Sequence, residues 1–294
     1  MSKRALIVGC GYTGSRLASL LLEMGLEVTG TTRDERRAAR LARAGVQPLF
    51  GELTDRETER QIDHLGPHVV FYLVPPQRAA EDQLPGLLDA TSRAPLEAFV
   101  YASSSSVYGD GGGDWMDETR EPQLVGNVAK LRHAAEKTIV RAQWEFQTPG
   151  RVCRLAGIYG PGRTLRAELE RGEYALIRGN DSWVNRIHVD DLACGLVAAW
   201  RNGSDGRVYN LVDDAPHRAW EFAFQAADLH ELRRPEWIEP EEARRRYDPE
   251  ILRRKLASRR LRNRRLKEEL GVNLKYPSYR EGLPAAVAEE RAGD

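Results

Sequence analysis

A short glycine-rich segment near the start of the chain constrains its fold more than any other feature. The sequence Gly-Cys-Gly-Tyr-Thr-Gly follows the apolar run Ala5–Val8 and precedes Ser15–Met24, whose leucines recur at helical spacing. Between a strand and a helix, such glycines allow a tight turn, close approach of a phosphate and close helix–strand packing. The free amides that follow bind an anion, so this segment predicts a dinucleotide pyrophosphate site; a glycine turn without a ligand is the alternative. The predicted contacts are Gly9, Gly11, Tyr12, Thr13 and Gly14.

Apolar runs of strand length alternate with helix-sized stretches through the first half of the chain. Continuous apolar runs are typical of strands covered on both faces, and strands separated by helices form parallel sheets. Right-handed crossovers then give a Rossmann-type, doubly wound α/β fold. The predicted strands are Ala5–Val8, Glu27–Thr31, Val46–Phe50, Val69–Val74, Phe99–Ser103 and Val152–Leu155.

The end of the second predicted strand bears on the choice of dinucleotide. NAD-binding proteins carry a carboxylate about 20 residues after the glycines, where it binds the ribose hydroxyls. Here Thr31 and Thr32 occupy that position and Arg33 follows, with Arg37 one turn later. A guanidinium suits a 2′-phosphate, which favours NADP. Asp34 is the counter-evidence, because a shift of two residues would make it the ribose acceptor, so NAD stays the alternative.

Composition and charge exclude several other classes of protein. Lys and Arg total 44 and Asp and Glu total 44, so no net charge draws the chain to nucleic acid or to a membrane surface. We expect no signal peptide and no membrane span, and therefore a cytoplasmic protein. The 3 cysteines are far apart, and the 6 histidines are scattered, so we expect no disulfide and no metal site.

A basic segment near the C-terminus is the one local exception to this balance. Residues 253–267 contain nine lysines and arginines on what we predict to be a helix. Nucleic-acid binding and a solvated helix face are the two interpretations. The second is favoured because glutamates lie nearby and no aromatic residues interleave with the basic ones.

From Phe99 onward the chain resembles the extended short-chain dehydrogenase/reductase superfamily, the NAD-dependent epimerase/dehydratase family. The similarity covers nearly the whole chain in the correct order, and within the superfamily it is strongest to atypical, YeeZ-like members. The segments that carry it are FVYASSSSVYG (99–109), RLAGIYGPGR (154–163), NRIHVDDLACGL (185–196), YNLVD (209–213) and ELGVNLKYPSYREGL (269–283).

This resemblance implies a mostly seven-stranded parallel sheet and a smaller C-terminal α/β substrate domain. The dinucleotide-binding domain would comprise residues 1–163 and 183–215, and the smaller domain residues 164–182 and 216–294. The substrate would bind between them, at the carboxyl ends of the strands. Members of the superfamily often form dimers, so we expect a monomer or a homodimer.

The resemblance also implies a catalytic set of serine, tyrosine and lysine, with the tyrosine four residues before the lysine. Ser104 matches the serine, and Lys130 matches the lysine that binds the nicotinamide ribose. Four residues before Lys130, however, stands Gly126. A general acid typically contributes about 10²–10⁴-fold to the rate, so its loss predicts an altered active site. Tyr108, Tyr159, Asn127 and bound water are the open candidates for the missing proton donor.

Further contacts follow from the same resemblance. Glu52 would contact the adenine amino group, and Leu53 and Val74 would line the cofactor site. Val184 replaces a phosphate-binding arginine of the sugar-nucleotide epimerases, which argues against a nucleotide-sugar substrate, and Arg186 is the nearest replacement. The predicted substrate contacts are Ser105, Tyr108, Asn185 and Arg186.

Two functions fit these features better than nucleic-acid binding. One is an NADP-dependent oxidoreductase or epimerase acting on a small carbonyl or sugar-like substrate. The other is an NADP-binding sensor or scaffold without turnover, which the glycine at position 126 favours.

Overall fold

A parallel sheet of seven strands forms the centre of the molecule. The computed structural model describes residues 2–53, 55–75 and 80–293. All adjacent strands of the sheet run parallel, in the order β12-β7-β5-β4-β1-β2-β3. The strands are β1 (Arg4–Val8), β2 (Glu27–Thr32), β3 (Gln47–Phe50), β4 (Val69–Tyr72), β5 (Ala98–Ser104), β7 (Gly150–Leu155) and β12 (Arg207–Leu211). The predicted doubly wound sheet is confirmed, with its order reversing between β1 and β4, where such folds bind ligands.

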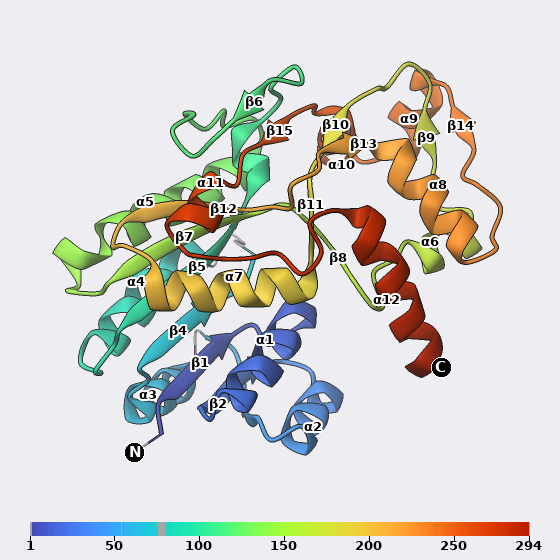
Figure 1. Cartoon of the computed structure of the whole chain (residues 1–294). Coiled ribbons are helices and arrows are strands. Elements are labelled where there is room, and N and C mark those ends of the chain that lie inside the picture. The colour runs from blue at the N-terminus through green and yellow to red at the C-terminus, as the bar shows by residue number, and fades with distance from the viewer. Residues whose placement is uncertain (1, 54, 76–79, 294) are drawn as a thin grey trace.

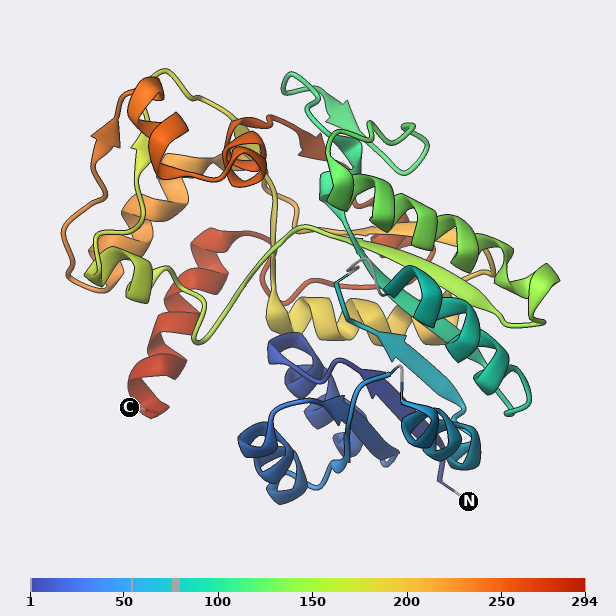
Figure 2. The same cartoon turned by 180° about the vertical axis from the view of Figure 1, so that it is seen from behind.

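Helices cover both faces of this sheet, as Figures 1 and 2 show from opposite sides. Alternate residues of β1 point into two separate cores: Ile7 packs with one and Val8 with the other. The first core includes residues of α1 (Tyr12–Glu23), α2 (Glu35–Arg43) and α7 (Val189–Asn202). The second includes residues of α3 (Arg56–Leu65), α4 (Ala80–Ser92) and α5 (Asn127–Glu145).

Smaller elements gather beyond one end of the sheet (Figure 1). They have apolar clusters of their own, one around Tyr159, Phe222 and Leu283 and another around Ile177 and Ala243. The predicted domain boundaries at 163, 182 and 215 stay a prediction. These elements are β8 (Gly157–Tyr159), α6 (Arg166–Glu170), β9 (Leu176–Ile177), β10 (Trp183–Val184), β11 (Arg186–His188), β13 (His217–Arg218), α8 (Ala219–Leu229), β14 (Trp237–Ile238), α9 (Pro240–Arg246) and α12 (Tyr279–Gly293).

The basic segment near the C-terminus does not form the single helix that its composition suggested. It divides into α10 (Pro249–Leu256), β15 (Arg260–Leu261) and α11 (Arg264–Glu268). The chain becomes extended after α10 because it pairs with the loop that follows β5. The Ser258 carbonyl accepts hydrogen bonds from two amides of that loop, at 2.9 and 3.0 Å, and β15 pairs with β6 (Trp115–Met116). Tertiary pairing therefore overrides the local helical preference.

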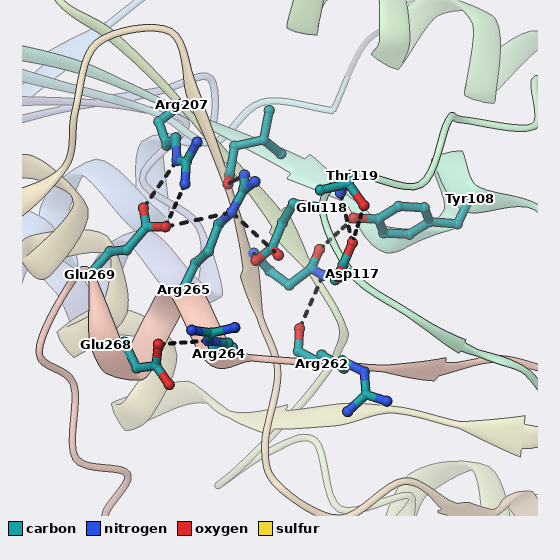
Figure 3. A network of polar contacts seen from close by, with 12 residues as sticks. Tyr108, Asp117, Glu118, Thr119, Arg207, Arg262, Arg264, Arg265, Glu268 and Glu269 are labelled. Carbon is teal, nitrogen blue, oxygen red and sulfur yellow. Dashed lines mark hydrogen bonds and ion pairs between the residues drawn. The ribbon is translucent and has the colours of Figure 1, made fainter.

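A polar network joins the same loop to α11 and β12 (Figure 3). The buried Glu118 carboxylate accepts a hydrogen bond from the Asn210 amide at 2.8 Å. Arg265 lies between Glu118 and Glu269, with its Nε 3.7 Å from a carboxylate oxygen of each. The loop is thus an anchored, ordered segment of the molecule.

Candidate dinucleotide site

A cavity of about 830 Å³ opens at the carboxyl ends of β1, β2 and β4. All of the predicted cofactor-binding residues except Lys130 line this cavity. The structure thus brings together four segments that are separate in sequence: the glycine loop, the end of β2, the turn after β3 and the end of β4. The predicted residues among its walls are Gly9, Gly11, Tyr12, Thr13, Gly14, Thr32, Arg33, Arg37, Glu52, Leu53 and Val74.

The glycine loop has the geometry that a bound pyrophosphate requires. Gly9 has φ +85°, and a Cβ there would lie 2.8 Å from a methyl carbon of Val74. A Cβ on Gly14 would lie 3.1 Å from the Gly9 carbonyl oxygen and 3.2 Å from the Ile7 side chain. Helix α1 begins directly after Gly11, with no acidic residue in its first turn. Its first amides and the positive end of its dipole therefore face the cavity without a competing carboxylate.

The residues after β2 bear on the choice between NADP and NAD. The Asp34 side chain caps α2 by accepting a hydrogen bond from the Arg37 amide at 2.8 Å. This hydrogen bond holds the pKa of the Asp34 carboxyl below its ordinary value. The carboxylate that would bind ribose hydroxyls is thus engaged in the helix cap. Arg33 lines the cavity and forms an exposed ion pair with Glu52 at 3.1 Å, a type of pair that contributes little to stability and exchanges readily.

Several cavity residues were not predicted. The most notable is Arg163, which follows β8 and stacks over the Tyr12 ring, with its guanidinium carbon 4.2 Å from the ring centroid. It adds a cation to the wall from a segment that is distant in sequence, which no local motif indicates. The other unpredicted lining residues are Cys10, Gly51, Leu73 and Ile158, and the remaining ones are Thr31, Asp34 and Pro75.

The serine segment lies at the end of β5, on the same edge of the sheet. Ser104 is half-buried, and its hydroxyl accepts a hydrogen bond from the Ser106 amide at 3.2 Å. Ser103 is buried and donates to the Glu136 carboxylate at 2.5 Å. Ser105 is buried as well. Of the three, Ser104 is the one that is not buried; it does not line the cavity, and its contact with a substrate stays a prediction.

The placement of Lys130 by spacing from Gly126 does not fit the structure. Lys130 lies on the exposed face of α5 and outside the cavity. Gly126 precedes α5 and has φ +88°, a conformation that side-chain-bearing residues rarely adopt. A tyrosine and a lysine four residues apart must share one helix face, and these two positions do not share a helix. The predicted ribose contact of Lys130 is therefore corrected.

Arg132 is the cation on the buried side of α5. Its Nε is buried and has no hydrogen-bond partner among the described residues. Burial lowers the pKa of its guanidinium, and the nearby Tyr101 phenol opposes that change. The signal that could have found it is helical periodicity, because Arg132 precedes the buried Glu136 by four residues. If Arg132 occupies the position of the catalytic lysine, the tyrosine position falls on Val128, so a tyrosine is missing in this alignment as well.

Most of the other predicted contacts are held inside the protein. Tyr108 is fully buried and donates to the Asn210 side chain at 2.8 Å. Tyr159 is fully buried as well, so neither phenol faces a ligand. Asn185 is buried, donating to the Arg259 carbonyl and accepting from the Leu261 amide, both at 2.9 Å. These placements overturn the substrate contacts of Tyr108 and Asn185, whereas Arg186 stays half-buried.

Within residues 2–53, 55–75 and 80–293, no group of three or more His, Cys, Asp or Glu residues is placed to hold a metal ion. In the same part of the chain, no helix is both long enough and apolar enough to cross a bilayer.

Known proteins resemble this chain over most of its length. Protein YeeZ of Escherichia coli strain K12 is 28% identical over 255 residues, which is 80% of this chain and 86% of YeeZ. A Stigmatella aurantiaca protein, 4-hydroxy-2-methyl-3-oxo-4-farnesyl-3,4-dihydroquinoline-1-oxide ketoreductase, is 25% identical over 226 residues, 71% of this chain and 67% of its own.

A solved structure and a family model complete the comparison. The structure of a functionally unknown conserved protein from Silicibacter pomeroyi DSS has a TM-score of 0.83 at 30% identity, covering 98% of this chain and 99% of that one. The model described as NAD dependent epimerase/dehydratase family matches residues 5–211. That span is most of the chain and includes residues of every strand of the central sheet, so the chain belongs to the NAD-dependent epimerase/dehydratase family.

Proposed function

We propose that this protein binds NADP and is an atypical oxidoreductase or epimerase acting on a small carbonyl or sugar-like substrate. The observation that carries the choice of NADP is the capping role of Asp34. Its carboxylate bonds to the Arg37 amide, while Arg33 and Arg37 both line the cavity. A 2′-phosphate there would meet two guanidinium groups and displace the exposed Glu52 from Arg33.

The remaining contacts follow from the walls of the cavity. The first amides of α1 would bind the pyrophosphate, and Arg163 would add a third cation above Tyr12. Leu53 and Val74 supply apolar surface for the rings. When bound, the cofactor supplies or accepts a hydride at its nicotinamide ring. The ketoreductase relative supports reduction of a carbonyl as the reaction type.

The protein residues have a narrower role in this chemistry than in typical members of the superfamily. The Ser104 hydroxyl, which is half-buried at the end of β5, would donate to the substrate oxygen. The phenols of Tyr108 and Tyr159 are buried in the interior. No tyrosine stands four residues before either Lys130 or Arg132. Proton transfer at the substrate oxygen would therefore involve water next to Ser104.

A second function is favoured by this missing tyrosine. An NADP-binding sensor or scaffold needs the cavity of the glycine loop but no proton donor. The two functions agree on cofactor binding and differ only in turnover.

The test is oxidation of NADPH with a panel of aldehydes and ketones, followed by loss of the nicotinamide absorbance. The oxidoreductase function predicts turnover that is faster with NADPH than with NADH. It also predicts a drop of about 100-fold in Ser104→Ala, with Ser106→Ala as the neighbouring control. Absence of turnover with saturating NADPH across the panel would leave the sensor as the function.

A further inference from the structure

The turn that follows β8 brings a cation to the dinucleotide cavity from beyond the central sheet. It spans residues 160–163, and the Arg163 amide closes it by donating to the Gly160 carbonyl at 2.8 Å. Gly162 is exposed and has φ +77°, and a Cβ placed on it would meet no atom within 4 Å. Because the backbone at this glycine is conformationally permissive, the position of Arg163 depends on contacts from outside the turn.

The guanidinium of Arg163 faces the cavity without an acidic partner. It lies over the Tyr12 ring, with its central carbon 4.2 Å from the ring centroid, and both residues line the cavity. In the described part of the chain, no carboxylate forms an ion pair with it, whereas Arg33 in the same cavity is paired with Glu52. The Arg163 guanidinium can therefore donate to a phosphate oxygen without first giving up an ion pair.

Glu290 of α12 holds the backbone on both sides of Arg163. Its carboxylate accepts a hydrogen bond from the Gly162 amide, and both of its oxygens lie 3.0 Å from the Thr164 hydroxyl. Thr164 is buried and the Glu290 side chain is nearly so, which strengthens hydrogen bonds to a charged group. The carboxylate thus fixes the residues before and after Arg163 and leaves the guanidinium itself unpaired.

A histidine that directly follows α8 completes this cluster. The single hydroxyl proton of Thr164 is donated to Glu290, so the His230 Nε2, at 2.8 Å, donates to the Thr164 oxygen. Helices α8 and α12 also share an apolar cluster that includes Phe222 and Leu283. The position of Arg163 is therefore set by helices that lie outside the seven-stranded sheet.

We propose that Glu290 is a positioning residue for the dinucleotide, holding Arg163 where its guanidinium contacts the pyrophosphate. The proposal rests on the proposed function, in which Arg163 is a cofactor contact, and extends it to the C-terminal helix. Glu290 does not line the cavity, so it would act only through Arg163. Because NADPH and NADH share the pyrophosphate, Glu290 should affect the binding of both equally, in contrast to Arg33.

The test is a double-mutant cycle, measured by calorimetric titration of the full chain with NADPH and, separately, with NADH. Arg163→Gln should weaken the binding of either dinucleotide about tenfold, because a charge-assisted contact is lost. Glu290→Ala should weaken it about fivefold, and Glu290→Gln, which keeps one acceptor oxygen, about threefold. Added to Arg163→Gln, either change should cost less than about twofold, because Glu290 then has no cation to position.

The matched control is Glu289→Gln, the neighbouring carboxylate on the same helix. Glu289 accepts hydrogen bonds from Arg16 of α1, at 2.7 and 2.9 Å. This ion pair is partly exposed, and exposed pairs contribute little, so the affinity for either dinucleotide should stay within about twofold of the wild type. A general loosening of α12 would weaken binding in both variants, whereas a positioning role is specific to Glu290.

The outcomes separate this inference from the choice of cofactor. Equal losses from Glu290→Ala with and without Arg163→Gln, an unchanged affinity in Arg163→Gln, or an equal loss in Glu289→Gln would overturn the positioning role. The cycle with Glu290→Gln decides if Glu290→Ala does not fold. Coupling with both dinucleotides but no preference for NADPH would contradict the choice of NADP and support the positioning role. Failure to bind either dinucleotide would overturn both.

Discussion

The cofactor side and the catalytic side of this protein are assembled in different ways. Each predicted segment of the cofactor cavity directly follows a strand, so a local pattern determines both its conformation and its place. On the catalytic side, α5 begins after Gly126, which takes a positive φ, and Lys130 lies on the exposed face of that helix. Local sequence motifs therefore predict a ligand site reliably where several strands end at one edge of the sheet. They predict it much less reliably where packing between distant segments decides where a helix begins.

The largest effect should come from the glycine loop. Gly9→Ala would force a side chain to φ +85° and place its Cβ 2.8 Å from Val74, so NADPH affinity should fall at least about 100-fold. The control is Gly25→Ala, which has φ +81° but no atom within 4 Å of the new Cβ. Calorimetric titration of both variants checks this; equal losses would mean that backbone strain alone, and not the cavity, explains the effect.

The next effect distinguishes the two dinucleotides. Arg33→Gln removes a charge-assisted contact of about 1.5–3 kcal/mol, so NADPH should bind roughly 10- to 100-fold more weakly. NADH affinity should change less than about twofold. The control is Arg43→Gln at the end of α2, the helix that follows Arg33, because the Arg43 side chain bonds to the Ala39 carbonyl. If NADPH and NADH weaken equally, Arg33 does not contact a 2′-phosphate.

The sequence predicted the sheet because its strands are continuous apolar runs, as in Val69–Tyr72, and the structure ends them within a few residues of the expected bounds. The glycine loop was equally predictable, because three glycines at this fixed spacing are compatible with few backbone conformations. Arg163 was not predictable, because it reaches Tyr12 across the fold. Lys130 was misplaced because the family spacing requires positions 126 and 130 to share one helix face, whereas α5 begins at Asn127.

A pH experiment tests the buried groups on the catalytic side. Burial, followed by the charge of Arg186, lowers the pKa of His217 to about 3. The unfolded chain takes up a proton near pH 6.5 and the folded chain does not, so stability falls as the pH drops below 6.5. Between pH 7 and pH 5 this group should cost about 2 kcal/mol. In urea unfolding, His217→Gln should therefore lose about 2 kcal/mol less of its free energy of unfolding between pH 7 and pH 5 than the wild type does.

His188 keeps part of the acid sensitivity in that variant, because burial lowers its pKa to about 4. A variant that loses as much stability as the wild type between the two pH values would show that His217 is not held neutral by its surroundings.

The smallest effect should be at Lys130. Because Lys130 is exposed and outside the cavity, Lys130→Gln should leave NADPH affinity within about twofold of the wild type. A large loss of NADPH affinity in this variant would show that Lys130 does contact the ribose, as the family spacing implies. The contrast between the cofactor side and the catalytic side would then not hold.

The most direct test of the account is calorimetric titration of the wild-type protein with NADPH and, separately, with NADH. The account predicts saturable binding of one NADPH per chain, at least about tenfold tighter than NADH, because Asp34 caps α2 and leaves Arg33 and Arg37 for the phosphate. Binding that is tighter for NADH, or no saturation with either dinucleotide, would contradict it.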